Sequence, residues 1–324
     1  MQPRVSVVIP TYNRGYILRC AVESVLQQSL SNLEVVIVDD GSTDDTRDIV
    51  ASFADRRIRY ICHDSNRGCS AAYNTGIFSA AGELVAFLDS DDMWKPEYLE
   101  RLESFLARHP EADAVFSDTE ILGAIVAIPS LIGLMPAFRA KLRKYPAGRE
   151  YVVTERDMFL CLLEEVPVKP SAVVIKRHVF DKVGGFDEKW PSGTDWDLFL
   201  RCSRVIRFGY VDEPLVIQKQ SDDSTFQHFL EKDKLFLVSV FLKHKFALKE
   251  DREALRAVNR GICSHYNSLA WVYLESGRNR AALKTYFQGF LETGRPRLLK
   301  KIGAGTVRIV LRGFTNIPGL KAWS

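Results

Sequence analysis

Three carboxylates lie close together in the segment Asp89-Ser90-Asp91-Asp92, directly after an apolar run, 84–88, that is typical of a buried strand. Like charges at this spacing repel one another and raise one another's pKa, so the cluster is favourable where a cation binds between them. Oxygen ligands favour a hard divalent ion such as Mg²⁺ or Mn²⁺, which needs few protein ligands when substrate phosphates and waters complete its shell. The alternative is a solvated acidic turn that caps the helix expected after Pro96.

Apolar periodicity predicts that strands and helices alternate through the first 120 residues. We expect strands at 5–9, 33–38, 58–61, 84–88 and 112–116, with a helix after each of the first four. Ser42 or Thr43 is expected to cap the second helix, and the fourth is expected from Pro96 to about Arg108. Such alternation predicts an α/β fold with a mostly parallel sheet covered by helices on both faces.

Polar residues follow these strands at the edge where parallel sheets bind their ligands. The segments are Thr11-Tyr12-Asn13, Asp39-Asp40-Gly41-Ser42 and Asp89-Ser90-Asp91, and we expect them to converge on one cleft. A dinucleotide site of the Rossmann type is not indicated, because the turn at 10–15 contains no GxGxxG pattern. The same turn lacks the glycine-rich basic loop expected of a nucleotidyltransferase.

Five motifs stand in the order found in family 2 glycosyltransferases, and residues 4–220 resemble this family. The motifs are 7–13, 38–44, Asn66-Arg67-Gly68 with 74–77, 87–92, and 184–187 with 195–198. The resemblance implies a GT-A (Rossmann-like) fold with a mixed sheet, which binds a nucleotide-diphosphate sugar, expected to be a UDP-sugar. It further implies transfer of the sugar with inversion to a hydroxyl of a glycan or lipid-linked acceptor, in polysaccharide biosynthesis of the cell envelope.

The resemblance also implies roles for single residues. Tyr12 would stack on the nucleotide base, and Asp40 would accept a hydrogen bond from the base edge. Asp91 would ligate the Mn²⁺ or Mg²⁺ ion that bridges the two phosphates, with Asp89 near the ribose and sugar and as a second ligand. Asp195 would be the catalytic base. The predicted nucleotide-sugar site comprises Pro10, Thr11, Tyr12, Asn13, Asp40, Arg67, Gly68, Asn74, Asp89 and Ser90.

Plainer interpretations stay open for these residues. Tyr12 as a loop aromatic and Asp40 as part of an Asx turn before a helix are the alternatives, and the joint placement of the two residues at strand ends favours the site over both. Asp195 is equally a cap for the helix that follows it. A non-catalytic nucleotide-sugar-binding protein with a partner-recruiting helical tail is therefore the alternative function, although the chain retains both Asp195 and the carboxylates at 89–92.

The chain departs from the family pattern at three places. Tyr73 stands where an Arg is common, Thr194 where a Glu is common, and residues 218–221 replace a segment that often contains His. These changes remove a basic contact to the nucleotide, a carboxylate that would tune the base, and a further metal or phosphate ligand. The candidate basic substitutes are Arg14, Arg67 and Lys219, and a solvated surface charge is the favoured interpretation of each.

The composition is that of an ordinary globular protein, with 324 residues, 46% of them hydrophobic and 26% charged. The net charge is +3, but residues 291–324 alone carry seven basic residues and one acidic residue. We expect no nucleic-acid partner. Six scattered cysteines without a CxxC pair indicate neither a zinc site nor disulfides and favour a reducing cytosol.

Three regions are expected: 1–120, the nucleotide-sugar-binding half; 121–222, the acceptor-binding half with the base; and 223–324, a helical region with a basic tail. In the last region, two helices joined at 275–279 resemble one tetratricopeptide-like hairpin. We see no signal peptide, and glycines and prolines interrupt the uncharged stretch 121–138, which favours a loop over a membrane span. The basic, apolar tail suits an anionic membrane, so we expect a cytoplasmic protein peripheral on the inner face; a solvated tail packed on its own domain is the alternative.

Overall fold

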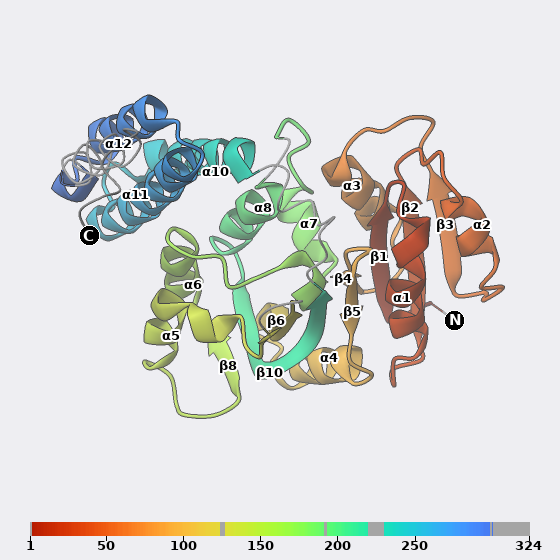
Figure 1. Ribbon diagram of the computed structural model, residues 1–324. Helices are drawn as coiled ribbons and strands as arrows, with labels where there is room; N and C mark the ends of the chain where they lie inside the picture. Colours follow the sequence, from red (N-terminus) through yellow and green to blue (C-terminus); the bar gives the residue numbers. More distant parts are fainter. Residues whose placement is uncertain (1, 124–126, 191–192, 220–229, 299, 301–324) are drawn as a thin grey trace, which may run out of the picture. The chain divides into compact units, whose positions relative to one another are not determined.

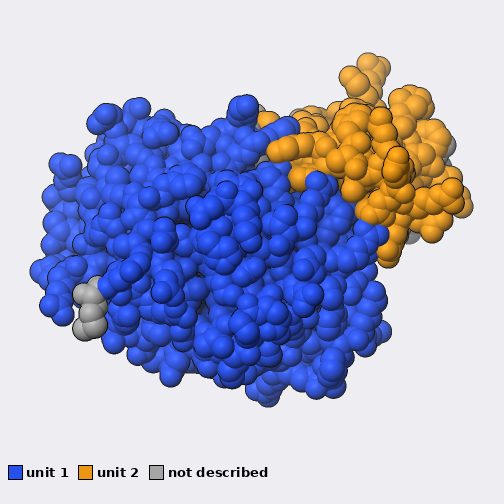
Figure 2. Space-filling model, turned by 180° about the vertical axis from the view of Figure 1, so that it is seen from behind, with its two compact units in different colours: residues 1–224 blue, residues 225–324 orange. Residues whose placement is uncertain are grey.

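The computed structural model describes residues 2–123, 127–190, 193–219, 230–298 and 300. The chain forms two compact units, residues 1–224 and 225–324, coloured separately in Figure 2. The first unit therefore contains both of the halves that the sequence analysis separates at residue 120, and these halves share one sheet.

The first unit is built on a ten-stranded sheet (Figure 1). Its strands are β1 (Val5–Thr11), β2 (Leu33–Asp39), β3 (Ile58–Cys62), β4 (Leu84–Phe87), β5 (Asp92–Trp94), β6 (Ala112–Leu122), β7 (Ala127–Ile128), β8 (Glu150–Val153), β9 (Val173–Lys176) and β10 (Arg207–Lys219). Their order is β3-β2-β1-β4-β9-β6-β10-β5, with β7 beside β6 and β8 beside β10. Because β1 to β4, β6 and β10 share one direction and β9 opposes its neighbours, the predicted mixed, mostly parallel sheet is confirmed.

Helices connect the strands and cover both faces of the sheet. They are α1 (Gly15–Leu26), α2 (Thr46–Ala51), α3 (Cys69–Ser79), α4 (Tyr98–Arg108), η1 (Ile132–Leu134), α5 (Pro136–Leu142), α6 (Glu155–Leu162), η2 (Pro170–Ala172), α7 (His178–Val183) and α8 (Thr194–Cys202). The buried side chains of α1 and α4 pack with Val7 and Ile9 on one face. On the other face α3 approaches so closely that a Cβ at Gly76 would lie 2.1 Å from a methyl carbon of Val8. Burial of apolar surface on both faces holds the sheet.

Two local predictions are wrong, for the same physical reason. Asp92 does not cap a helix, because it begins strand β5, which pairs antiparallel with β10. Neither Ser42 nor Thr43 caps α2, which begins at Thr46. The Ser42 hydroxyl instead accepts a hydrogen bond from the backbone N–H of Asn13, at 2.8 Å. In both cases the residue interacts with a partner that is distant in the sequence, and it does not form the cap that local rules predict for the nearest helix.

The uncharged stretch 121–138 is not a single helix. Its described residues form the end of β6, β7, η1 and the start of α5. Across the part of the chain that the structure describes, no helix is both long and apolar enough to cross a bilayer.

The second unit is helical, as the sequence predicts, with α10 (Leu230–Lys245), η3 (Phe246–Leu248), α11 (Arg252–Glu275) and α12 (Asn279–Thr293). The turn between α11 and α12 has Gly277 at φ 73°, a conformation that glycine adopts without steric cost. Tyr273, Tyr286 and Leu298 belong to the apolar cluster between these helices. Most of the basic tail, 301–324, lies outside the described residues.

Candidate active site

The carboxyl ends of β1, β2 and β4 lie side by side in the sheet. Thr11 pairs in register with Asp39, and the backbone N–H of Asp40 donates to the carbonyl of Thr11 at 2.9 Å. On the other side of β1, the N–H of Leu88 donates to the carbonyl of Val8 at 3.0 Å. The sheet therefore brings the three predicted strand-end segments to one edge.

The loop after β1 is fixed by side-chain hydrogen bonds to the loop after β2. Asn13 takes a left-handed backbone conformation, with φ 51°, and its side-chain oxygen accepts the N–H of Thr43 at 2.8 Å. The neighbouring Tyr12 stays 43% exposed, so one face of its ring is accessible to a ligand. The hydroxyl oxygen of Thr11 is buried and has no hydrogen-bond partner among the described residues. An unsatisfied buried hydroxyl is unusual, and it lies where the nucleotide is predicted to bind.

Asp40 holds the loop that contains Arg67 and Gly68. Its carboxylate accepts hydrogen bonds from the N–H groups of Arg67 (2.9 Å) and Gly68 (2.7 Å), and it lies 2.7 Å from Nδ1 of His63. The residue is only 2% exposed. Its predicted hydrogen bond to the base stays a prediction, and in this structure its partners lie within the protein.

The remaining predicted nucleotide ligands divide by accessibility. Pro10, near the end of β1, and Ser90, in the loop after β4, are buried, whereas the side chain of Arg67 is 54% exposed and lies 3.6 Å from Glu188. Lys219, a candidate basic substitute, is exposed at the end of β10. Among these residues only Arg67 and Lys219 present a charged side chain to solvent.

Asp89 lies at the centre of the acidic cluster. Burial, and then the charge of Asp91, raise the pKa of Asp89 to about 6. The hydroxyl of Tyr73 donates to the Asp89 carboxylate at 2.6 Å and stabilises its ionised form. Sequence reasoning treated Tyr73 only as the loss of an arginine, although a tyrosine one residue before a predicted site residue could have indicated a hydrogen-bond donor.

Asp91 and Asp92 differ sharply in their surroundings. Asp91 forms an ion pair with Arg14 at 2.7 Å, and about a quarter of each side chain remains exposed. Asp92 is 4% exposed, and burial followed by the charge of Asp89 raises its pKa well above the usual range. Arg14 is therefore a cation at the acidic cluster itself, not a solvated surface charge.

The residues present fit a divalent ion in part. No group of three or more His, Cys, Asp or Glu side chains within the described ranges is arranged to enclose a metal. Asp89 and Asp91 are nevertheless close enough for the charge of Asp91 to affect the pKa of Asp89. Their two negative charges, when both are ionised, are greater than the single positive charge of Arg14. Two carboxylates with open positions match Mg²⁺ or Mn²⁺, which share their shell with phosphate oxygens and water.

Helix α3 connects this cluster to the second half of the unit. Tyr73 stacks on Phe186, with ring centroids 4.8 Å apart. The side-chain amide of Asn74 accepts the N–H of Phe186 at 2.7 Å and donates to its carbonyl at 2.9 Å. Asn74 thus holds the glycine turn at 184–187, and its predicted contact with the nucleotide stays a prediction.

Asp195 lies in the first turn of α8. Its charge is one of those that raise the pKa of Asp89, which places the two carboxylates within electrostatic reach. Ser70 at the start of α3 donates to the hydroxyl of Thr194 at 3.0 Å and so fixes the start of α8. The Asp195 side chain has no hydrogen bond to the described residues, and it is partly exposed.

Asp197, two residues further along α8, has a structural role. It is fully buried and forms an ion pair with Arg201 at 2.9 Å. The guanidinium of Arg201 also donates to the carbonyl of Gly185 at 2.8 Å. Asp197 therefore anchors α8 to the glycine turn and is inaccessible to a substrate.

The family model described as Glycosyl transferase family 2 matches residues 6–149. An uncharacterised glycosyltransferase of Rickettsia typhi is 30% identical over 68% of this chain and 65% of its own length. The UDP-Glc:α-D-GlcNAc-diphosphoundecaprenol β-1,3-glucosyltransferase WfgD of Escherichia coli is 37% identical over 32% of this chain and 42% of its own. The matches span 34%, 31%, 65% and 64% of four curated relatives, less than two thirds in each case.

Solved structures share the fold at low sequence identity. S. aureus TarS 1–349, in complex with UDP-GlcNAc, superposes with a TM-score of 0.68 at 17% identity, covering 91% of this chain and 82% of the other. The mannosyltransferase PcManGT from Pyrobaculum calidifontis, in complex with GDP-Man and Mn²⁺, gives 0.58 at 19% identity, covering 96% and 81%. The predicted GT-A fold is thus confirmed by its structural neighbours.

Proposed function

The chain belongs to glycosyltransferase family 2, and on this premise we propose that it moves a sugar with inversion from a nucleotide-diphosphate sugar to an acceptor hydroxyl. One observation carries the proposal. Asp195 and the carboxylates of 89–92 come from distant parts of the chain, yet the charge of Asp195 acts on Asp89. A single displacement requires a base for the acceptor hydroxyl close to the site that binds the diphosphate of the donor.

On the acceptor side, the Asp195 carboxylate takes the proton of the acceptor hydroxyl as its oxygen attacks the anomeric carbon. The new bond forms on the face opposite the bond that breaks, so the configuration inverts. The electron pair of the broken bond leaves with the nucleoside diphosphate. Partial exposure of Asp195 suits this role, because a base must reach its substrate.

On the donor side, the exposed ring of Tyr12 stacks on the base, and the unsatisfied hydroxyl of Thr11 is free to bond a polar group of the nucleotide. Asp91 and Asp89 would hold Mn²⁺ or Mg²⁺, which supplies positive charge to the leaving diphosphate when bound. Arg14 must then release Asp91 or share it, and its guanidinium lies where it would bond a phosphate oxygen.

The finer assignments rest on relatives. A UDP-sugar is the proposed donor, and a glycan or lipid-linked acceptor the proposed partner, because WfgD is named for UDP-Glc and a diphosphoundecaprenol acceptor. A GDP-sugar, as in the PcManGT complex, is the alternative that experiment must test. We also propose a cytoplasmic enzyme of cell-envelope polysaccharide synthesis that contacts an anionic membrane through its basic tail.

A donor panel tests this function directly. The purified chain is incubated with UDP-, GDP- and dTDP-sugars, with Mn²⁺ or with a chelator, and slow hydrolysis of each donor is followed. We expect turnover of one nucleotide class, at a rate that the chelator lowers at least tenfold. An equal absence of hydrolysis and of binding for every donor would contradict the proposal.

A further inference from the structure

A cavity of about 380 Å³ lies in the first unit, away from the acidic cluster. Its walls come from η1, α5, β8 and β10 and from the loop at 143–149. None of these elements contributes a residue to the predicted donor site or the predicted base. Its lining combines aromatic rings, two guanidiniums and one carboxylate, a composition typical of sites that bind a polar ligand by shape and charge.

Two of the four basic residues at 139–144 have no ion-pair partner in the described part of the chain. Lys141 and Lys144 both pair with Asp157, at 3.1 and 2.9 Å. Arg139 and Arg143 are exposed, line the cavity and form no ion pair with a described residue. Arg139 lies on α5, and Arg143 directly follows its last residue in a helical backbone conformation. The two like charges are four positions apart and repel each other weakly, so an anion bound to both would be favourable.

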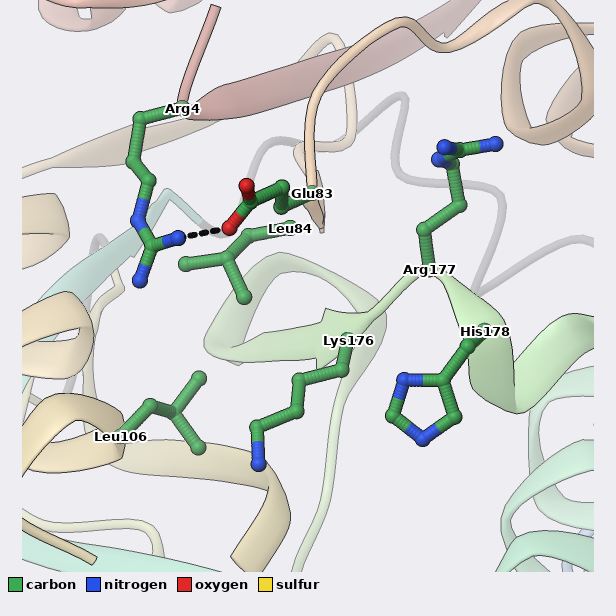
Figure 3. A pocket seen from close by; sticks show the side chains of 7 residues that line it. All are labelled: Arg4, Glu83, Leu84, Leu106, Lys176, Arg177 and His178. Carbon is green, nitrogen blue, oxygen red and sulfur yellow. Dashed lines mark hydrogen bonds and ion pairs between the residues drawn. The ribbon is translucent and has the colours of Figure 1, made fainter. Parts of the chain in front are cut away.

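A second cavity provides a comparison, because two of its lining cations form ion pairs with carboxylates of the protein. It measures about 300 Å³ and is lined by Arg4, Glu83, Lys176 and His178 among others (Figure 3). There Arg4 pairs with Glu83, and Lys176 lies 3.2 Å from Asp113. Two cations of that cavity are thus paired with carboxylates of the protein, and Arg177 donates to the carbonyl of Gly82 at 2.9 Å. Arg139 and Arg143 form no ion pair with a described residue.

The hydroxyls of the three tyrosines in the first cavity all donate to groups of the protein. Tyr145 bonds Asp157 at 3.1 Å, Tyr151 bonds the carbonyl of Gly148 at 2.5 Å, and Tyr210 bonds Asp212 at 2.7 Å. Tyr151 also stacks on Tyr210, with ring centroids 6.0 Å apart. With their hydroxyls satisfied, the rings are held in place and offer apolar surface to a ligand.

We propose that this cavity binds a segment of an anionic saccharide. Its negative group bonds the guanidiniums of Arg139 and Arg143, its ring packs on Tyr151, and a hydroxyl donates to the exposed carboxylate of Asp212. Guanidinium binds a sugar carboxylate and a sugar phosphate by the same chemistry. That the saccharide is part of the acceptor polymer rests on the proposed function, but its binding to the cavity does not.

The test uses the full chain without donor or metal. Calorimetry at low salt measures binding of an oligogalacturonate, a glycerol-phosphate oligomer and neutral maltohexaose. We expect one of the anionic probes to bind at least tenfold more tightly than maltohexaose. Arg139→Gln with Arg143→Gln should weaken that binding at least tenfold, while Lys144→Gln, the matched control in which Lys141 still pairs with Asp157, should leave it within twofold.

Two results would overturn the proposal. One is unchanged affinity of the anionic probes in the double arginine variant. The other is equal competition by inorganic phosphate together with no effect of Tyr151→Leu, which would reduce the cavity to a simple anion site. Because the titration contains no donor, failure here is distinguishable from failure of the donor panel.

Discussion

Two groups of like charge lie in the same unit, and the protein accommodates them differently. The carboxylates of 89–92 crowd at a strand end, where burial raises the pKa of Asp89 and Asp92. Arg139 and Arg143 stand on an exposed helix beside a cavity. Repulsion is strong where water is excluded and weak where water and salt screen it. The acidic group therefore destabilises the folded protein to the extent that Arg14 leaves its charge unbalanced, whereas the basic group costs little when its cavity is empty.

The acidic group is therefore coupled to the stability of the fold, whereas Arg139 and Arg143 are not. Substitutions in the acidic group should change turnover, metal binding and stability together. Substitutions at Arg139 and Arg143 should change only the choice of ligand. The following predictions test that division, beginning with the largest effect.

Asp195→Asn should lower sugar transfer by roughly 10²–10⁴-fold, the range attributable to general-base catalysis. Donor affinity should stay within a few-fold, because the substitution is nearly isosteric. Transfer and donor binding are measured separately, with Asp181→Asn on α7 as an exposed control. The capping interpretation of Asp195 is wrong, because Gly193 is the N-cap of α8 and the helix has no side-chain cap. Transfer at the wild-type rate in Asp195→Asn would remove Asp195 as the base.

Asp91→Asn and Arg14→Gln should act in opposite directions on metal binding. Loss of the Asp91 charge should weaken Mn²⁺-dependent binding of the nucleoside diphosphate at least tenfold, by roughly 1.4 kcal/mol or more. Removal of Arg14 takes away the competing cation at 2.7 Å, so Mn²⁺ alone should bind a few-fold more tightly. Calorimetry checks both, and unchanged Mn²⁺-dependent binding in Asp91→Asn would contradict the metal assignment.

Asp89 predicts an unusual pH dependence of stability in the metal-free protein. Its pKa is about 6 when folded and about 4 when unfolded, so the folded state binds the proton more tightly. Its contribution to the free energy of unfolding is therefore full below about pH 4 and is lost as pH rises through 6. Because Asp89 is only partly buried, we expect about 1–2 kcal/mol from this group.

The measurement is the melting temperature with a chelator at pH 5 and pH 7, for the wild type and Asp89→Asn. Asn cannot ionise, so the variant should gain stability relative to the wild type at pH 7 and lose that advantage at pH 5. The same difference at both pH values would show that the charge of Asp89 is not the cause.

Removal of the tail after Lys300 should have the smallest effect on turnover, with donor hydrolysis within twofold of the full chain. Leu298 packs in the apolar cluster of α11 and α12, so a cut at Gly294 would disturb the helical unit itself. Sedimentation with anionic liposomes should fall strongly, because the tail carries most of the excess basic charge. Equal sedimentation of both proteins would refute the membrane role.

The sequence by itself determined the features that depend on neighbouring residues. Apolar runs and helical spacing located β1, β2 and β4 to within a few residues, because side-chain periodicity and backbone geometry are local. The order of the motifs indicated the family, and helical spacing in the last hundred residues predicted that the C-terminal region is helical. The position of strand ends predicted that Tyr12, Asp40 and Asp89 lie at one edge of the sheet.

The tertiary structure alone decided how distant residues pair. Pairing with β10 places Asp92 in a strand. The hydroxyl of Tyr73 donates a hydrogen bond to Asp89, and Arg14 forms an ion pair with Asp91. The tertiary structure also distinguished Asp195, whose charge acts on Asp89, from Asp197, which is buried and paired with Arg201. Residues two apart on a helix point in different directions, and burial and charge depend on what packs against each. Those neighbours lie up to about a hundred residues away, where local periodicity carries no information.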